Sequence, residues 1–347
     1  MKRENVIGRA NVEQTPELEA YYQSLEGESL GALWEVANEI EPWYPQPKSV
    51  PILWKWKRIE PFVRRAPQLV SAEKAARRVV MLVNPGRKEW SAAAGLLYTG
   101  VQIMNPGEFT SAHRHQASAL RFIMEGRGAY TVVDGERMAL GARDLVLTPN
   151  GTWHDHGIDA DGTQCIWQDG LDIPLMNSLD ANFYEVHPDT LQRPGGPQSR
   201  EGWSKPYSPV FKYSWDESYD KLKSETRRSE FDGVVVEYLN PVTGGPIMPT
   251  IGAQLQLLRP KEQTRAHRHT GSAIYQVAKG RGWSVIEGKR FDWEEKDIFA
   301  LPSWAAHSHA NASSSEDAVL FSFNDFPAMR ALALYREEAI QDGSAAS

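Results

Sequence analysis

Two regions of the chain have the composition and spacing of short β-strands. In the first, from about Arg78, segments rich in β-branched and aromatic residues are separated by glycine, proline, asparagine and aspartate; they include RVVMLVNP, LLYTGVQIM, LRFIMEG and DLVLTPNG. In the second, from Ile247, the same pattern returns in AQLQLL, SAIYQVAKG, KDIFALPSW and AVLFSFND. Short strands at close spacing with turn residues between them are typical of a β-sandwich or β-barrel. The pattern therefore predicts an all-β fold.

Helical patterns flank and separate these regions. Thr15-Pro16-Glu17 predicts a helix start, because threonine caps helices and proline suits the first helical position. A Pro-, Gly- and Ser-rich segment followed by SWDESYDKLKSETRR predicts a linker with a short helix, and FPAMRALALYREEAI predicts a closing helix. The expected parts are a helical and irregular extension over 1–77, a first β domain over 78–175, the linker over 176–245, a second β domain over 246–326, and a C-terminal helix with a tail over 327–347.

The two β regions are repeats of one another. The segment PGEFTSAHRHQASALRFIMEGRGAYTVVDG in the first matches PKEQTRAHRHTGSAIYQVAKGRGWSVIEG in the second. His113 aligns with His267, and Gly126 aligns with Gly280 at the same offset. An internal repeat of this length predicts two copies of one fold.

Composition and charge exclude several classes of function. The net charge of −7 gives no reason to expect binding to nucleic acid or to anionic membranes. No apolar stretch reaches the roughly 20 residues of a spanning helix, and the N-terminus lacks the apolar core of a secretory signal. A single cysteine, Cys165, excludes an intrachain disulfide framework and thiolate metal clusters. We therefore expect a cytoplasmic protein.

Histidine placement indicates a metal site. Eight of the nine histidines occur in four H-x-H pairs, and residues i and i+2 of a strand share a face. His113 and His115 therefore point to the same side, and His154 from a later strand completes a set of three imidazole nitrogens. Such a set suits iron, zinc, copper or nickel. The alternative is a metal-free barrel that keeps these rings in its core or on its surface.

The repeat carries the same set again, in His267, His269 and His307. These three residues form a candidate second metal site. A duplicate that keeps its ligands without a function is an equal alternative for this copy.

The spacing of the first set resembles the two motifs of the cupin superfamily: Gly107-x5-His113-x-His115, then Gly126, then Pro149-x-Gly151-x2-His154. The common cupin pattern continues with a glutamate ligand, where this chain has Ala119. Three neutral ligands keep the full +2 charge of a divalent metal and leave about three octahedral positions open. Such a centre favours an anionic ligand that binds through two atoms.

Over nearly the whole chain, the sequence resembles the gentisate 1,2-dioxygenases and their relatives that act on salicylate, substituted salicylates and 1-hydroxy-2-naphthoate. The strongest blocks are HRHQASALRFIMEG, PNGTWHDHG, WQDGLDIP and HRHTGSAIYQVAKGRG. The resemblance implies a bicupin, with two tandem jelly-roll β-barrels, an N-terminal helical extension and a homotetrameric assembly. It also implies one Fe(2+) in the first barrel and insertion of O2 between the carboxyl-bearing and hydroxyl-bearing carbons of a 2-hydroxybenzoate.

A substrate carboxylate needs a cationic partner. Arg121 has the strand parity of His113, so a regular strand directs its guanidinium into the same cavity, where a bidentate contact with a carboxylate is strong. The alternative is a surface arginine. Arg77 and Arg78 both precede the VVML strand, and the resemblance favours Arg77 as a second substrate-binding residue. Tyr275 stands in the second copy where the first has Arg121, so we expect the catalytic metal in the first barrel.

His156 follows His154 by two residues, and a continuing strand places it beside the metal. The ordinary pKa of histidine suits a proton shuttle, which is the role that the resemblance implies. A histidine that only orients its neighbours fits the sequence equally well. Asp169 could pair with His156 as part of the catalytic set and fix its tautomer, and Asp172 is the competing choice.

Tyr98, Gly100 and Gln102 alternate on one strand and share a face. Gln102 could hydrogen-bond the substrate, Gly100 would let a ring approach the backbone, and Tyr98 would form a pocket wall. Family members that cleave salicylate tend to carry tryptophan at the position of Tyr98. We therefore expect gentisate as the substrate, with 5-substituted salicylates (nitro-, halo- or aminosalicylate), salicylate and 1-hydroxy-2-naphthoate as alternatives. The alternatives without dioxygenase activity are a metal-dependent isomerase or hydrolase and a non-catalytic binding bicupin.

Overall fold

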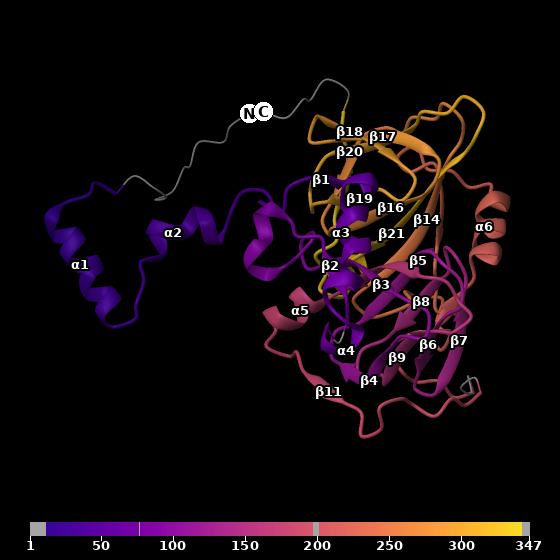
Figure 1. Ribbon diagram of the computed structural model, residues 1–347. Coiled ribbons are helices and arrows are strands. Elements are labelled where there is room, and N and C mark those ends of the chain that lie inside the picture. The colour runs from indigo at the N-terminus through magenta and orange to yellow at the C-terminus, as the bar shows by residue number, and fades with distance from the viewer. Residues whose placement is uncertain (1–11, 76, 197–200, 342–347) are drawn as a thin grey trace. The chain divides into compact units, whose positions relative to one another are not determined.

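The computed structural model describes residues 12–75, 77–196 and 201–341 (Figure 1). The chain forms two units, Met1–Gln46 and Pro47–Ser347. Residues 342–347 of the predicted tail lie outside the described residues, as do four residues of the predicted linker, 197–200. Within the described residues, no helix combines the length and the apolar character needed to cross a membrane.

The described part of the first unit contains two helices, α1 (Pro16–Gly27) and α2 (Leu33–Ile40). The start of α1 is the one that the sequence predicts, because the Thr15 side chain accepts a hydrogen bond from the Leu18 amide at 3.2 Å. Trp34 Nε1 donates a hydrogen bond to the Tyr22 hydroxyl at 2.9 Å and so links α2 to α1.

The first β region forms a barrel of two antiparallel sheets. Their strand orders are β12-β8-β5-β10-β3-β2 and β11-β4-β9-β6-β7. The strands are β2 (Val79–Met81), β3 (Tyr98–Met104), β4 (Phe109–His115), β5 (Ala119–Glu125), β6 (Ala129–Val133), β7 (Glu136–Leu140), β8 (Leu145–Thr148), β9 (His154–Ile158), β10 (Cys165–Leu171), β11 (Tyr184–Val186) and β12 (Lys212–Tyr213).

The second β region forms an equivalent barrel. Its strand orders are β1-β19-β16-β21-β14-β13 and β18-β17-β20-β15-β22. The strands are β1 (Ile52–Trp54), β13 (Val234–Glu237), β14 (Gly252–Leu258), β15 (His267–His269), β16 (Ala273–Lys279), β17 (Arg281–Ile286), β18 (Lys289–Glu294), β19 (Ile298–Leu301), β20 (His307–Asn311), β21 (Ala318–Asn324) and β22 (Glu337–Ala339).

The sequence repeat is also a repeat of topology. The order β8-β5-β10-β3 in the first barrel corresponds to β19-β16-β21-β14 in the second. Figure 1 shows the two barrels as neighbouring bodies, with the first in magenta and the second in orange to yellow. The predicted all-β fold, with two tandem barrels and helices near both ends of the chain, is confirmed.

Short helices occupy the connections. The helix predicted in the linker is α6, and the Ser214 side chain caps it by accepting a hydrogen bond from the Glu217 amide at 3.4 Å. The remaining elements of the second unit are α3 (Trp56–Leu69), α4 (Ala72–Ala75), the 3-10 helix η1 (Pro85–Trp90), α5 (Ile173–Ser178), α6 (Trp215–Ser224) and α7 (Phe326–Ala331).

Two segments differ from the sequence-based expectation. Within the segment expected to be helical or irregular, β1 pairs antiparallel with β19 of the second barrel. The closing helix is short, because α7 ends at Ala331 and β22 then pairs with β15. Both β1 and β22 are edge strands, and their backbone groups pair with N–H and C=O groups at the edge of a sheet that would otherwise be unpaired. This pairing with a distant segment outweighs the helical or irregular pattern of the local sequence.

The two barrels contact each other through β5 of the first and β21 of the second. On β5, Phe122 stacks on Phe321 of β21, with ring centroids 4.0 Å apart and an angle of 4° between the planes. The neighbouring residue Arg121 points to the opposite face, because side chains alternate along a strand. β5 is therefore buried on both faces, with one face on the second barrel and the other on the interior of the first.

Candidate metal centre and its surroundings

Three histidines of the first barrel converge on one point. β4 supplies His113 and His115, and β9 supplies His154, which is the cross-strand partner of His113. Their ligand nitrogens all lie within 4.8 Å of one another, and all three rings are buried. The structure therefore brings together the three nitrogens that the sequence predicts as metal ligands.

The hydrogen-bond partner of each Nδ1 leaves the Nε2 lone pair of the same ring free to bind a metal. Backbone carbonyl oxygens lie 2.7 Å from Nδ1 of His113, 2.7 Å from Nδ1 of His115 and 2.9 Å from Nδ1 of His154. A carbonyl only accepts hydrogen bonds, so each Nδ1 carries the ring hydrogen and each Nε2 keeps a lone pair. Each Nε2 is buried and has no hydrogen-bond partner among the described residues. This donor set fits a divalent transition metal.

The electrostatic surroundings keep the rings uncharged. Burial, together with the positive charge of Arg77, lowers the pKa of His113 to about 3 and that of His115 to about 4. Burial lowers the pKa of His154 well below its ordinary value as well. Protons therefore do not compete with a metal for these nitrogens near neutral pH.

Arg121 lies in the same cavity, held by an acidic partner. Its Nε is 3.2 Å from Oδ1 of Asp169, the residue opposite it on β10. Its Nη1 donates a hydrogen bond to the Thr148 hydroxyl at 3.2 Å, and Trp167 Nε1 donates one to Asp169 Oδ1 at 3.2 Å. Burial lowers the pKa of Arg121 to about 10, with Asp169 acting in the opposite direction, so the guanidinium stays charged.

The side chains of Arg77 and Arg78 have different surroundings in the structure. The Arg78 side chain is buried and forms an ion pair with Glu108. Arg77 is half-buried, and its charge acts on His113, His115 and Asp169. Of the two arginines, Arg77 is therefore the one whose charge reaches the candidate metal centre.

Tyr98, Gly100 and Gln102, which alternate along β3, lie beside the same cavity. Gly100 is the cross-strand partner of Asp169, and Tyr98 and Gln102 lie on either side of it. Both polar atoms of the Gln102 amide are buried without a hydrogen-bond partner among the described residues, so this amide can still bind a ligand. A Cβ at Gly100 would lie 2.4 Å from Val79 Cγ1, which explains the glycine. Burial, and then the charge of Asp169, raises the pKa of Tyr98, so its hydroxyl stays protonated.

His156 is also buried in this cavity, and the expected pairing with Asp169 is wrong. Thr131 on β6 is the partner instead, with its Oγ1 2.8 Å from His156 Nδ1. Asp169 contacts Arg121 and Trp167, and the competing residue, Asp172, accepts a hydrogen bond from the Ser118 amide at 2.7 Å. Burial, and then the Arg121 charge, lowers the pKa of His156 well below its ordinary value.

Thr131, Thr148 and Trp167 were not identified from the sequence. Thr131 is the cross-strand partner of His156. Trp167 lies two residues before Asp169 and so shares its face of β10. Strand parity could have pointed to Trp167, but the pairing of β6 with β9 cannot be deduced from spacing alone.

The second barrel holds its own triad, with different neighbours. The ligand nitrogens of His267, His269 and His307 also lie within 4.8 Å of one another. His267 Nδ1 is 3.0 Å from Glu337 Oε1, and its Nε2 is 3.5 Å from Asp232 Oδ1. At the position of Arg121 this barrel has Tyr275, which is buried and stacks on Phe299 with ring centroids 4.8 Å apart. At this position the second barrel therefore has an aromatic ring in place of the guanidinium that we expect to bind a substrate carboxylate.

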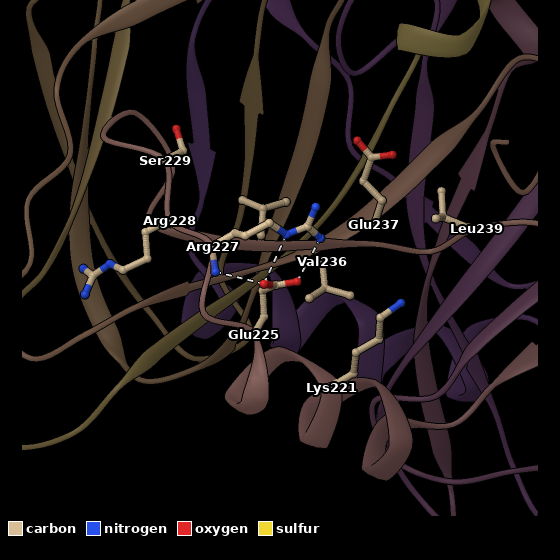
Figure 2. Close-up of a pocket in the computed structure, with 10 residues that line it drawn as sticks. Lys221, Glu225, Arg227, Arg228, Ser229, Val236, Glu237 and Leu239 are labelled. Carbon is tan, nitrogen blue, oxygen red and sulfur yellow. Dashed lines mark hydrogen bonds and ion pairs between the residues drawn. The ribbon is translucent and has the colours of Figure 1, made fainter. Parts of the chain in front are cut away.

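A separate groove lies between α6 and β13 and has a volume of about 520 Å³ (Figure 2). Figure 2 shows Glu225 and Arg227 paired with each other at its centre, with Lys221 and Glu237 at one side. None of the residues lining it is a histidine or a predicted site residue. The groove therefore takes no part in the candidate metal centre.

Comparisons with known proteins agree with this geometry. The cupin domain family matches residues 100–174 and 254–324. The chain is 38% identical over 342 residues to gentisate 1,2 dioxygenase 1 of Aquipseudomonas alcaligenes, covering 93% of this chain and 96% of the relative. It is also 38% identical over 342 residues to 5-aminosalicylate 1,2-dioxygenase of Comamonas sp, covering 93% and 90%.

A solved structure matches the whole fold. The salicylate 1,2-dioxygenase of Pseudoaminobacter salicylatoxidans, in an adduct with gentisate, superposes with a TM-score of 0.90 at 30% identity, covering 98% of each chain. The match includes both barrels, and the sequence relatives share more than a third of their residues with this chain. The chain belongs to the bicupin family of gentisate 1,2-dioxygenases and related ring-cleaving dioxygenases.

Proposed function

We propose that this protein is an Fe(II)-dependent ring-cleaving dioxygenase that inserts O2 between the carboxyl-bearing and hydroxyl-bearing carbons of a 2-hydroxybenzoate, with gentisate as the first substrate. The observation that carries this proposal is the set of three buried Nε2 atoms of His113, His115 and His154, each with its lone pair free. A cytoplasmic location and a homotetrameric assembly belong to the same proposal.

Charge favours an anionic substrate. The positive charges of Arg77 and Arg121 both act on Asp169 and on His113, and the histidines are neutral. His113, His115 and His154 would hold a ferrous ion, which would add two further positive charges and would supply Lewis-acid and redox chemistry for the reaction of the substrate with O2. The guanidinium of Arg121 would hold the substrate carboxylate through two hydrogen bonds.

The remaining cavity residues would orient the ring. The Gln102 amide has both polar atoms available, and Val79 fills the space beside Gly100. The Tyr98 hydroxyl stays protonated, so it can hydrogen-bond a polar substituent such as the 5-hydroxyl of gentisate. A 5-substituted salicylate shares the chelating half of gentisate and is the second candidate substrate.

Oxygen uptake tests the proposal. The protein is loaded with Fe(II) under anaerobic conditions and offered gentisate, 5-aminosalicylate, 5-nitrosalicylate, salicylate and 1-hydroxy-2-naphthoate in turn. We expect one O2 to be consumed for each substrate cleaved, and His113→Ala to abolish uptake. Conversion of a substrate without oxygen consumption would instead identify an isomerase or hydrolase. Binding of a ligand without conversion would instead identify a non-catalytic binding bicupin.

A further inference from the structure

Four histidines share the cavity of the first barrel, but one has a different kind of partner. His113, His115 and His154 each direct Nδ1 at a backbone carbonyl. His156 directs Nδ1 at the Thr131 hydroxyl, 2.8 Å away. A carbonyl can only accept a hydrogen bond, whereas a hydroxyl can donate or accept one. The tautomer of His156 therefore depends on whether the Thr131 hydroxyl donates or accepts this hydrogen bond.

Burial decides the direction of this hydrogen bond. Thr131 is 0% exposed, and among the described residues its hydroxyl contacts no hydrogen-bonding atom other than His156 Nδ1. If Nδ1 carried the ring hydrogen, two buried groups would lack a partner among the described residues, the hydroxyl hydrogen and the Nε2 lone pair; if the hydroxyl donates, only the Nε2–H lacks one, which costs less. The hydroxyl therefore donates to Nδ1, and the ring hydrogen of His156 lies on Nε2.

The second barrel repeats the arrangement. There, the Ser284 hydroxyl lies 2.8 Å from Nδ1 of His309 and also accepts a hydrogen bond from Trp293 Nε1 at 3.0 Å. Ser284 occupies on β17 the place that Thr131 occupies on β6, opposite the second histidine of its pair. In both barrels the histidine that precedes this second histidine by two positions, His154 or His307, directs Nδ1 at a backbone carbonyl instead, at 2.9 Å in each case.

We propose that Thr131 is a positioning residue that holds His156 as the Nε2–H tautomer, so that this ring stays off the metal and donates a hydrogen bond to an oxygen of the bound substrate. The rings of His154 and His156 are 5.5 Å apart, so a fourth imidazole lone pair on the same side would compete for an open coordination position. Nε2 of His156 is buried and has no partner among the described residues. The substrate part of this inference rests on the proposed function, and the tautomer does not.

The tautomer can be measured directly. NMR of protein labelled with ¹⁵N-histidine gives different coupling patterns between ring nitrogens and ring hydrogens for the two neutral tautomers. The protein is loaded with diamagnetic Zn(II), and the signal that is missing in His156→Gln is assigned to His156. We expect Nε2–H in the unmodified protein and in Thr131→Ser, which keeps the hydroxyl. We expect Thr131→Val, which has the same shape without the hydroxyl, to lose the pure Nε2–H pattern.

Kinetics provide a second readout. With Fe(II) and gentisate, Thr131→Val should lower kcat by on the order of 10-fold with little change in KM, and Thr131→Ser should restore it. Thr110→Val is the matched control, because the Thr110 hydroxyl accepts a hydrogen bond from the backbone amide of His156 at 3.1 Å rather than from its ring. This control should keep the Nε2–H pattern.

Several results would overturn the proposal. These are an Nδ1–H pattern in the unmodified protein, an unchanged pattern and kcat in Thr131→Val, or a Thr131→Ser protein as impaired as Thr131→Val. The thermal midpoint of each variant is recorded, and Thr131→Ser separates loss of the hydroxyl from loss of fold. If no 2-hydroxybenzoate drives oxygen uptake but the Nε2–H pattern depends on the Thr131 hydroxyl, the proposed function fails and the tautomer assignment stands.

Discussion

Oδ1 of Asp169 lies 3.2 Å from Nε of Arg121, and the two residues are direct cross-strand partners on β10 and β5. Their side chains are 6% and 2% exposed, so water contributes little to holding the pair. Asp169 thus fixes the direction of the guanidinium that faces the candidate metal centre. The carboxylate acts through Arg121, and not through His156 as the sequence suggested.

Replacing Asp169 should therefore affect both stability and substrate binding. Asp169→Asn keeps the shape but leaves a buried guanidinium without its counter-ion, which should lower the free energy of unfolding by about 3 kcal/mol. The KM for gentisate should rise by on the order of 10-fold, because Arg121 is no longer oriented. Urea denaturation and oxygen uptake measure the two effects. Unchanged values in both would contradict this role for Asp169.

The two histidine triads should differ in their importance for catalysis. His113→Ala removes a ligand beside Arg121, and we expect it to abolish oxygen uptake. His267→Ala changes the cavity that has Tyr275 in place of the guanidinium, so uptake per folded chain should persist. Metal content per chain, measured alongside, shows which triad each substitution empties. A protein that stays active after His113→Ala and loses activity after His267→Ala would reverse the assignment of the catalytic barrel.

Tyr98 should set the preference for the ring substituent. Tyr98→Trp fills the pocket wall with a larger ring and removes the phenol, so the ratio of kcat/KM for gentisate over salicylate should fall by on the order of 10-fold. Tyr98→Phe is the matched control, since it keeps the ring size and removes the hydroxyl alone. If the ratio is the same in all three proteins, Tyr98 has no part in recognising the substituent.

Asp325 should make stability depend on pH. Burial raises its pKa from 3.8 to about 7, although it accepts a hydrogen bond from the Ser272 amide at 2.7 Å. Between these pH values the folded chain holds a proton that the unfolded chain has lost, so the free energy of unfolding decreases as pH rises from about 4 to about 7. The contribution is about 1 to 4 kcal/mol.

Asp325→Asn tests this dependence, because an amide of the same shape cannot ionise. Its side-chain oxygen can still accept the hydrogen bond from Ser272. The thermal midpoint of the variant should exceed that of the unmodified protein increasingly as pH rises from 4 to 8. A difference in midpoint that is constant across this range would show that the pKa of Asp325 is the same in the folded and the unfolded chain.

Strand parity accounts for much of what could be predicted. Side chains alternate along a strand, so spacing alone grouped His113 with His115, and Tyr98 with Gly100 and Gln102, on single faces. The internal repeat predicted two barrels, and the structure confirms them. The edge strands β1 and β22 were not predicted, because they are held by pairing with distant segments rather than by their own pattern.

The sequence by itself determined which residues share a face of each strand, because that depends only on local alternation. Only the tertiary structure decided how those residues are paired. Register between strands placed Asp169 against Arg121 and Thr131 against His156. The carbonyls that face the Nδ1 atoms of the other three histidines are only two residues away along the chain. The partners on other strands set the ring hydrogen of His156 and the surroundings of the guanidinium, because a hydrogen bond or a buried ion pair requires atoms about 3 Å apart, and spacing along the chain does not specify which strands come that close.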